Sequence, residues 1–344
     1  MHRDVRAVRP ALAAVLLIAL VGALLGGGAA PAQAAKGDSK VTRVRLGSAA
    51  DVRPALRGPS LFLQGNGAPN TTAFQAHINQ VAAAPLDIVV LSASFPSSGS
   101  QTPECDALIR LSNINSCETV TITAARGAND AGATGAVNNA EIVYFSGGDQ
   151  CNYVGWRGSS VYNAVKGVAA RSGGVGGGSA GLAIQGDYVY DACTGSVISS
   201  EALSNPYHRF ISFSYDFFQW TYLRQVITDS HFVTRNRMGR LMSFVARQIA
   251  EGKTEAAYGL GIDEGAVIVI DPSGLGTLYG GSAYVVLADH APERVASRQP
   301  LSFSNYKIWK LSPGSTYNFA SRPTTGYYLR SVTDGVIGGD PYTP

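Results

Sequence analysis

The feature that most constrains the fold of this 344-residue chain is a run of glycines around a single serine. From Gly173 to Gly181, every residue is glycine except Val175, Ser179 and Ala180. Glycine loses more conformational entropy on folding than any other residue, so a run of glycines is costly to order. Such a run is expected where backbones pass so close together that no side chain fits. The segment GGSAG also satisfies G-x-S-x-G, the strand-to-helix turn that exposes a nucleophilic serine. We therefore predict this turn at Ser179, with a flexible glycine-serine linker as the alternative.

Apolar and helical segments alternate through the first half of the chain. Short apolar runs predict buried strands at residues 61–67, 87–94, 119–125 and 141–150, and helical spacing predicts helices at 73–83 and 159–171. This alternation favours an α/β fold with a doubly wound, mostly parallel sheet, whose site lies at the carboxyl ends of the strands. Additional C-terminal strands are expected as antiparallel additions to one edge of the same domain, at residues 266–270, 283–289, 306–311 and 327–332.

The N-terminal segment is typical of a secretory signal peptide. Three arginines precede an apolar run at residues 11–25, and Ala32 and Ala34 follow in A-x-A spacing. We expect a secreted, extracellular protein without a membrane segment after cleavage; an uncleaved anchor is the alternative. The predicted division of the chain is a signal peptide at 1–35, a flexible lead-in at 36–57, a catalytic domain at 58–322 and a C-terminal tail at 323–344.

The four cysteines of the chain, Cys105, Cys117, Cys151 and Cys193, predict two disulfides, because an exported chain meets oxidising conditions. Three pairings are open. Cys105–Cys117 is favoured because these residues bracket a short loop, which leaves Cys151 with Cys193. A zinc site is the alternative, although the chain has no C-x-x-C motif. The net charge of +3 is too small to argue for nucleic acid as a partner.

A serine nucleophile needs a base, and an acid that orients the base. Among the five histidines, His231 follows an apolar strand-like run, and Asp263 and Glu264 supply carboxylates further along the chain. An α/β-hydrolase-type esterase would instead use His290, because its histidine comes after its acid. A catalytically silent binding protein on the same fold is the other alternative.

Three arginines, Arg235, Arg237 and Arg240, follow His231 closely. They form either a solvated helix face or a wall that binds anions, since guanidinium groups pair bidentately with carboxylates.

Four segments in this order, YFSGGDQ, GGSAG, DSHFVTRNRMGRL and GIDEG, resemble the cyanophycinase branch of the peptidase E family of serine peptidases. The later segment QPLSFSNYKIWKLSPGSTYNFASR is also similar to that branch, so the resemblance runs from about residue 60 to about 322. It implies a doubly wound α/β fold similar to class I glutamine amidotransferases, and hydrolysis of peptide bonds by a serine. It implies no metal and no organic cofactor. The expected partner is a peptide substrate, either cyanophycin or another acidic or β-aspartyl peptide, and a homodimer is one expected oligomeric state.

The resemblance also assigns roles to residues. It makes Ser179 the nucleophile, His231 the base and Glu264 the acid that orients the base. Backbone N–H groups of Gly148 and Ala180 would bind the oxyanion. The residues expected to bind substrate are Gln150, Asp229, Ser230, Arg235, Arg237 and Arg240.

Two residues depart from the usual pattern of that branch. Ser230 stands where the branch usually has glutamine, and this change lies in the expected substrate pocket. Gly178 stands where the branch usually has threonine, which makes the serine turn sterically easier.

Overall fold

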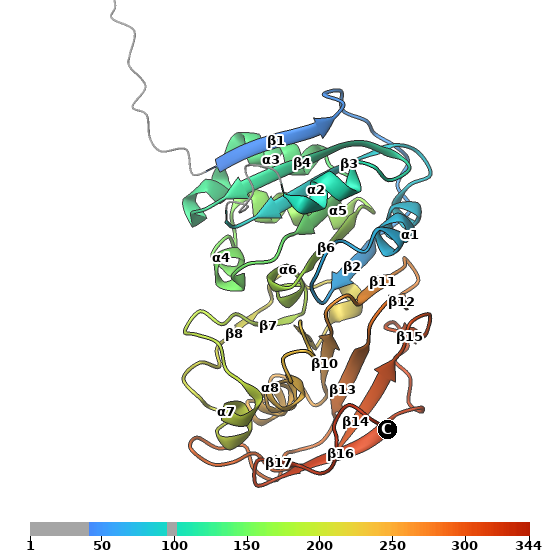
Figure 1. Ribbon diagram of the computed structural model, residues 1–344. Helices are drawn as coiled ribbons and strands as arrows, with labels where there is room; N and C mark the ends of the chain where they lie inside the picture. The colour runs from blue at the N-terminus through green and yellow to red at the C-terminus, as the bar shows by residue number, and fades with distance from the viewer. Residues whose placement is uncertain (1–40, 95–101) are drawn as a thin grey trace, which may run out of the picture. The chain divides into compact units, whose positions relative to one another are not determined.

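The computed structural model describes residues 41–94 and 102–344, which all belong to one compact unit. The predicted signal peptide and the first residues of the predicted lead-in lie outside these ranges. Two β-sheets, of nine and eight strands, organise the described part of the chain (Figure 1).

The first sheet has a parallel centre. Its strand order is β1 (Val41–Gly47), β4 (Ile114–Ile122), β3 (Leu86–Ser92), β5 (Ile142–Phe145), β6 (Gly174–Gly178), β2 (Ser60–Gln64), β11 (Val267–Ile270), β12 (Leu275–Tyr279) and β15 (Thr316–Asn318). Strands β4, β3, β5, β6 and β2 pair in parallel. Strand β1 at one edge and strands β11, β12 and β15 at the other pair antiparallel.

Helices cover both faces of this parallel centre. Successive side chains of a strand point to opposite faces, so each strand contacts helices on both sides. In β2, Leu61 and Leu63 share a buried cluster with residues of α3 (Ala131–Asn139) and α5 (Ser160–Ala170). Phe62 points to the other face, where its ring lies 4.8 Å from Phe74 of α1 (Thr71–Val81). Helix α2 (Pro103–Leu108) packs on that second face as well. The parallel centre is therefore doubly wound.

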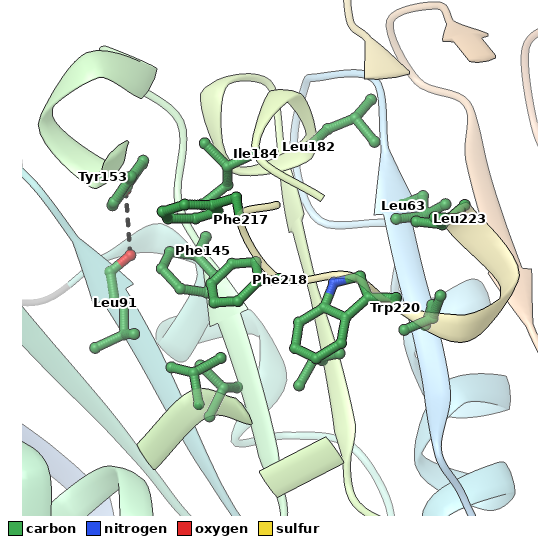
Figure 2. Packing of buried hydrophobic residues seen from close by; sticks show 14 of the residues in the cluster. Leu63, Leu91, Phe145, Tyr153, Leu182, Ile184, Phe217, Phe218, Trp220 and Leu223 are labelled. Atoms are coloured by element: carbon green, nitrogen blue, oxygen red, sulfur yellow. Dashed lines mark hydrogen bonds between the residues drawn. The ribbon is translucent and has the colours of Figure 1, made fainter. Parts of the chain in front are cut away.

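The larger core cluster contains a group of packed aromatic rings near the carboxyl end of β5 (Figure 2). Phe145 lies 5.6 Å from Phe218 between ring centroids, and Phe218 stacks on Trp220 at 4.7 Å. Tyr153, in the short helix α4 (Gln150–Val154), donates hydrogen bonds to the carbonyl oxygens of Ser146 at 2.9 Å and Leu91 at 3.3 Å. These contacts fix α4 against the strand ends.

The second sheet is mostly antiparallel. Its strand order is β17 (Val336–Ile337), β16 (Tyr328–Thr333), β14 (Phe303–Leu311), β13 (Ala283–Ala288), β10 (Ala257–Ile262), β9 (Val226–Asp229), β7 (Tyr188–Tyr190) and β8 (Phe213–Tyr215). Only β10, β9 and β7 pair in parallel within it. Helix α8 (Met238–Ala250) packs on this sheet and on α7 (Ser199–Ser204), and it buries most of its side chains.

The mixed α/β class with a parallel centre agrees with the prediction, and so do the strands and helices predicted before residue 172. Three expectations need correction. Of the four later segments, only residues 266–270 extend the first sheet, as β11; the other three lie in the second sheet. Residues 41–47 of the expected flexible lead-in form β1, since Arg43 and Arg45 pair with Glu118 of β4. Residues 328–333 of the expected tail form β16, paired with β14.

Both disulfides form with the favoured pairing, which leaves these cysteines unavailable as zinc ligands. Cys105–Cys117 joins α2 to β4, with an S–S distance of 1.99 Å. Cys151–Cys193 joins α4 to the segment that follows β7, at 2.06 Å. Within residues 41–94 and 102–344, no helix has the length and apolarity that a membrane span needs.

Candidate active site

The glycine run is an ordered turn and no linker. Strand β6 ends at Gly178, α6 (Ala180–Ala183) begins at Ala180, and Ser179 between them has φ 52° and ψ −113°. The backbone of a non-glycine residue with a positive φ is strained, and such strain is typical of turns at functional sites. A Cβ atom on Gly176 would lie 2.0 Å from the carbonyl oxygen of Phe62, and one on Gly181 would lie 2.1 Å from that of Phe145. Neighbouring backbones thus leave no room for side chains around Ser179.

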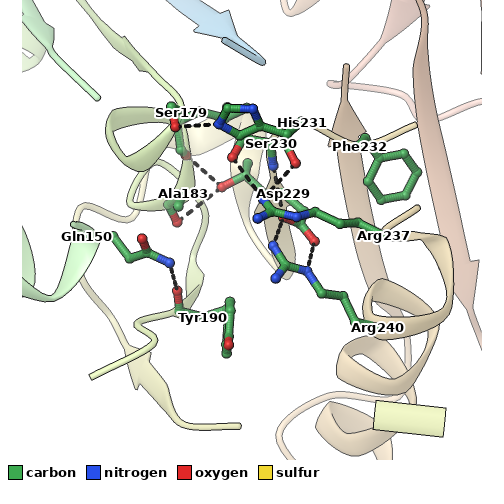
Figure 3. Close-up of polar contacts among 12 residues, drawn as sticks. Gln150, Ser179, Ala183, Tyr190, Asp229, Ser230, His231, Phe232, Arg237 and Arg240 are labelled. Carbon is green, nitrogen blue, oxygen red and sulfur yellow. Dashed lines mark hydrogen bonds and ion pairs between the residues drawn. The ribbon is translucent and has the colours of Figure 1, made fainter. Parts of the chain in front are cut away.

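A chain of two hydrogen bonds starts at this serine. The Ser179 Oγ atom lies 2.8 Å from Nε2 of His231, and Nδ1 of His231 lies 2.5 Å from Oε1 of Glu264. His231 comes two residues after β9, and Glu264 lies in the turn between β10 and β11. A carboxylate only accepts, so Nδ1 carries the proton and Nε2 is free to accept the proton of Ser179. Figure 3 shows the first of these two contacts.

His231 is buried, and burial is the main cause that lowers its pKa from the usual value of 6.5. The hydrogen bond to Glu264 raises that pKa, while the charges of Arg235 and Arg237 lower it further. The net direction is downward, so the imidazole is neutral at pH 7 and can take up a proton.

Two backbone N–H groups border the serine side chain. A Cβ atom on Gly147 would lie 3.5 Å from Cβ of Ser179, so the Gly147–Gly148 segment runs directly beside Ser179. Gly148 has φ +134°, which residues with side chains rarely adopt. Ala180 is the first residue of α6, where an N–H has no partner within the helix. Among the described residues, neither the Gly148 nor the Ala180 N–H has a hydrogen-bond acceptor.

A cavity of about 330 Å³ opens beside Ser179 and His231. It is lined by Gly148, Asp149, Gln150, Ser179, Ala180, Ala183, Tyr190, Ala192, Gly195, Ser196, Thr228, Asp229, Ser230, His231, Arg235, Arg237 and Arg240. Every predicted site residue therefore lines one cavity, except Glu264, which contacts His231. His290 is not among the lining residues; its Nδ1 lies 3.4 Å from Oδ1 of Asp289.

The three arginines differ in their surroundings. Arg240 is buried and pairs bidentately with Asp229, with Nε–Oδ2 at 2.7 Å and Nη2–Oδ1 at 2.5 Å. Arg237 is half-buried and donates to the carbonyl oxygen of Ser230 at 2.9 Å, but its contact with Asp229 is 3.4 Å long (Figure 3). Arg235 is exposed at the cavity edge, and no side-chain ion pair with it occurs in the described ranges.

The charged side chains that line the cavity carry a net positive charge, because three arginines face two aspartates, Asp149 and Asp229, and Asp229 pairs bidentately with Arg240. Burial lowers the pKa of Arg237 to about 10, and the nearby charges of Arg240 and Arg235 act in the same direction. Arg237 is still protonated at neutral pH, and an anion in the cavity would stabilise it. The alternative of a solvated helix face is wrong, because Arg235 lies in the exposed turn before α8 and Arg240 within α8 is buried.

Several lining residues were not predicted from the sequence. Tyr190, Ala192, Gly195 and Ser196 lie in and after β7, a segment without a recognisable motif. Asp263, which precedes Glu264, has a structural role: its Oδ1 accepts from the N–H groups of Val233 at 3.0 Å and Thr234 at 2.9 Å. It thereby holds the loop that carries His231. No group of three or more metal-ligating side chains occurs in the described part of the chain.

Comparison with known proteins gives partial matches. No protein-family model matches the chain. Two curated cyanophycinases, from Trichormus variabilis (strain ATCC 29413 / PCC 7937) and Nostoc sp. (strain PCC 7120 / SAG 25.82 / UTEX 2576), are each 35% identical to it over 103 residues. This match covers 28% of the chain and 33% of each relative, so it spans about a third of the length of these cyanophycinases.

Among solved structures, a peptidase from an acI-B1 Actinobacterium has a similar fold. The TM-score is 0.51 at 13% sequence identity, and the alignment covers 77% of this chain and 98% of that one. At this identity, the similarity concerns the fold alone. The chain is therefore similar to cyanophycinases over part of its sequence, and similar in fold to a peptidase.

Proposed function

We propose that the protein is a serine-type, exopeptidase-like peptidase that hydrolyses acidic or β-aspartyl peptides, such as cyanophycin. The observation that carries this proposal is the chain of contacts from Ser179 Oγ to His231 Nε2 at 2.8 Å and from His231 Nδ1 to Glu264 Oε1 at 2.5 Å, beside a cavity rich in arginine. The similarity to cyanophycinases over about a third of their length supports the same substrate class.

In the proposed reaction, His231 removes the proton from Ser179 as its Oγ attacks the carbonyl carbon of the scissile bond. Glu264 stabilises the imidazolium that forms. The N–H groups of Gly148 and Ala180 are placed to bind the negative oxygen of the tetrahedral intermediate. The intermediate then expels the amine, which takes its proton from His231, and water hydrolyses the acyl-enzyme by the same route.

The charge of the cavity supports a substrate with a free carboxylate. Asp229 pairs bidentately with Arg240, and Asp149 balances at most one of Arg235 and Arg237, so a positive charge remains for an anion. A β-linked aspartyl unit has a free α-carboxylate next to its scissile bond. A guanidinium group can bind such a carboxylate through two parallel hydrogen bonds.

We also propose that the mature protein is exported, with cleavage of the signal peptide predicted at residues 1–35. The two disulfides support this, because disulfides persist in oxidising compartments. Sequencing of the N-terminus of protein recovered from the culture medium tests the cleavage site. A homodimer is part of the proposal, and light scattering on the mature protein measures it.

The decisive experiment incubates the purified mature protein and its Ser179→Ala variant with cyanophycin, β-aspartyl dipeptides, their α-linked isomers and simple esters. We expect the wild-type protein to hydrolyse β-linked peptides and the Ser179→Ala variant to leave them intact. An esterase would hydrolyse only the esters, and a binding protein would bind a peptide without hydrolysing it.

A further inference from the structure

A disulfide joins two segments that line the substrate cavity. Cys151 is the second residue of α4 and directly follows Gln150, which lines one side. Cys193 lies in the segment after β7, which lines a neighbouring part of the cavity through Ala192, Gly195 and Ser196. The two Cα atoms are 5.0 Å apart.

The side that carries Cys151 is anchored independently of this bond. Tyr153 of α4 is fully buried, and its hydroxyl donates to the carbonyl oxygens of Ser146 and Leu91. Helix α4 therefore keeps its place when the disulfide is opened.

The segment that carries Cys193 is joined to α4 mainly by the disulfide. Residues 191–198 form no helix or strand, and their other hydrogen bonds lead to elements other than α4. Val197 accepts from Arg240 at 3.1 Å through its carbonyl oxygen and donates to the Tyr190 hydroxyl at 2.9 Å through its N–H. Asp191 accepts from the hydroxyls of Ser212 and Ser214, and Thr194 donates to the carbonyl oxygen of Arg209 at 2.8 Å. Among the described residues, a single long hydrogen bond also joins this segment to α4: Gln150 Nε2 donates to the Tyr190 carbonyl oxygen at 3.3 Å (Figure 3).

We propose that Cys151–Cys193 is a positioning element of the substrate pocket: it holds residues 192–196 against α4 and so sets the width of the cavity. Its loss weakens substrate binding and leaves the chemistry of Ser179 intact, because neither cysteine contacts the Ser179–His231–Glu264 chain. This inference rests on the proposed peptidase function. It deepens that function by assigning a determinant of substrate affinity outside the hydrogen-bonded chain.

The two disulfides differ in their accessibility. Cys193 is exposed and Cys151 is half-buried, whereas Cys105 and Cys117 are both fully buried. Thiol–disulfide exchange requires access to a sulfur atom, so a dithiol reductant opens Cys151–Cys193 first. In that exchange, the dithiol supplies two electrons and two protons, gives two cysteine thiols and closes into its own cyclic disulfide. Substrate affinity therefore responds to a thiol reductant.

The experiment compares a Cys151→Ser/Cys193→Ser variant with a matched control, Cys105→Ser/Cys117→Ser, in the full chain. Kinetics on one β-aspartyl peptide give kcat and KM for each protein. We expect KM to rise about 10-fold in the pocket variant because the segment must be ordered when substrate binds, while kcat stays within about twofold. The control leaves both constants unchanged, although thermal unfolding of either variant begins at a lower temperature.

Wild-type protein treated with dithiothreitol gives a second measurement that needs no variant to fold. Thiol labelling followed by peptide mapping identifies which cysteines are reduced, and KM is expected to rise in step with reduction of Cys151 and Cys193. An unchanged KM in both experiments, or equal rises in KM for the pocket variant and the control, overturns the proposal.

A readout that does not depend on peptidase activity separates this inference from the proposed function. Hydrogen exchange of residues 190–198 is expected to speed up on reduction, while exchange of α4 stays the same. Fluorophosphonate labelling of Ser179 is expected to keep its rate. If wild-type protein hydrolyses no peptide, the proposed function fails; if exchange of residues 190–198 does not change on reduction, the positioning proposal fails.

Discussion

His231 and Glu264 are 33 residues apart in the chain, yet Nδ1 of the histidine lies 2.5 Å from Oε1 of the glutamate. Strands β9 and β10 bring them together: they pair in parallel, and each residue follows the carboxyl end of its strand. Carboxyl ends of parallel strands meet at the same edge of a sheet, so a base and its acid can come from separate loops and still meet.

Replacement of Ser179 or His231 by alanine should abolish peptide hydrolysis. The members of a nucleophile–base pair act as a unit, so we expect losses in kcat of similar size, on the order of 10³-fold or more. His290→Ala is the control, because His290 lies outside the cavity and should leave kcat/KM within a few-fold. Loss of activity in His290→Ala with retention in His231→Ala would favour an esterase-type arrangement instead. Thermal unfolding checks that each variant is folded.

The pH profile of kcat/KM should follow the pKa of His231. The base must be neutral to accept a proton. Burial and the neighbouring arginines lower the pKa of His231 below 6.5. Activity on an uncharged ester should therefore persist at pH 6.5 and fall only at lower pH. Removing the charge in Arg235→Gln raises the pKa of His231, which moves the acid limb to higher pH. Glu264→Gln removes a group that raises this pKa, and the limb should move to lower pH. A limb that stays in place in both variants would contradict the assignment of His231 as the base.

The arginines of the cavity should recognise a carboxylate of the substrate. Amidation of that carboxylate removes a charged hydrogen bond of about 1.5–3 kcal/mol, which corresponds to a loss of about 10- to 150-fold in kcat/KM. Arg237→Gln should cause a similar loss with the carboxylate substrate and little further loss with the amidated one. Arg298→Gln, an exposed arginine outside the cavity, is the matched control. Equal rates on both forms of the peptide would show that the arginines do not bind its carboxylate.

Ser230 should widen the cavity relative to the glutamine that cyanophycinases usually have at this place. Its Oγ lies 3.4 Å from Nη1 of Arg237, so a longer side chain would reach into the space beside that guanidinium. We expect Ser230→Gln to raise the ratio of kcat/KM for cyanophycin to that for a bulkier β-linked peptide. Ser230→Ala should leave this ratio unchanged, and the idea fails if the glutamine variant behaves like the alanine variant.

Tyr342 near the C-terminus should stabilise the loop that carries the base. Its hydroxyl accepts from the N–H of Met238 at 3.0 Å and lies 3.1 Å from Oδ1 of Asn236. Tyr342→Phe leaves a buried N–H at the start of α8 without its partner, so the free energy of unfolding should fall by about 1–3 kcal/mol. Tyr279→Phe is the control, since no hydrogen bond of the Tyr279 hydroxyl occurs in the described chain. Denaturant unfolding curves measure both variants, and equal stabilities would refute this role.

The sequence alone was sufficient to predict the parts of the structure that depend on local constraints. The turn at Ser179 could be predicted because only glycine fits where β6 and α6 pass within contact of Phe62 and Phe145. The buried strands of the parallel centre could be predicted because strands covered on both faces are continuous apolar runs. The chain order of the serine, the histidines and the glutamate is compatible with both the His231 and the His290 arrangement, and the contact between Ser179 and His231 in the folded protein favours the first.

Only the tertiary structure decided features that depend on partners distant in sequence. The charged residues of β1 are typical of a loop. In the folded protein, Arg43 and Arg45 pair with Glu118 of β4, and the segment forms a strand. The spacing of the three arginines in the sequence does not indicate which of them are buried. In the folded protein, Arg240 is buried and paired with Asp229, whereas Arg235 is exposed. Residues 192–196 have no motif of their own, and this segment is held by contacts with distant partners, namely Cys151 at Cys193 and Arg209 at Thr194. In each case the stabilising contact joins segments that are distant in sequence and meet only in the folded protein.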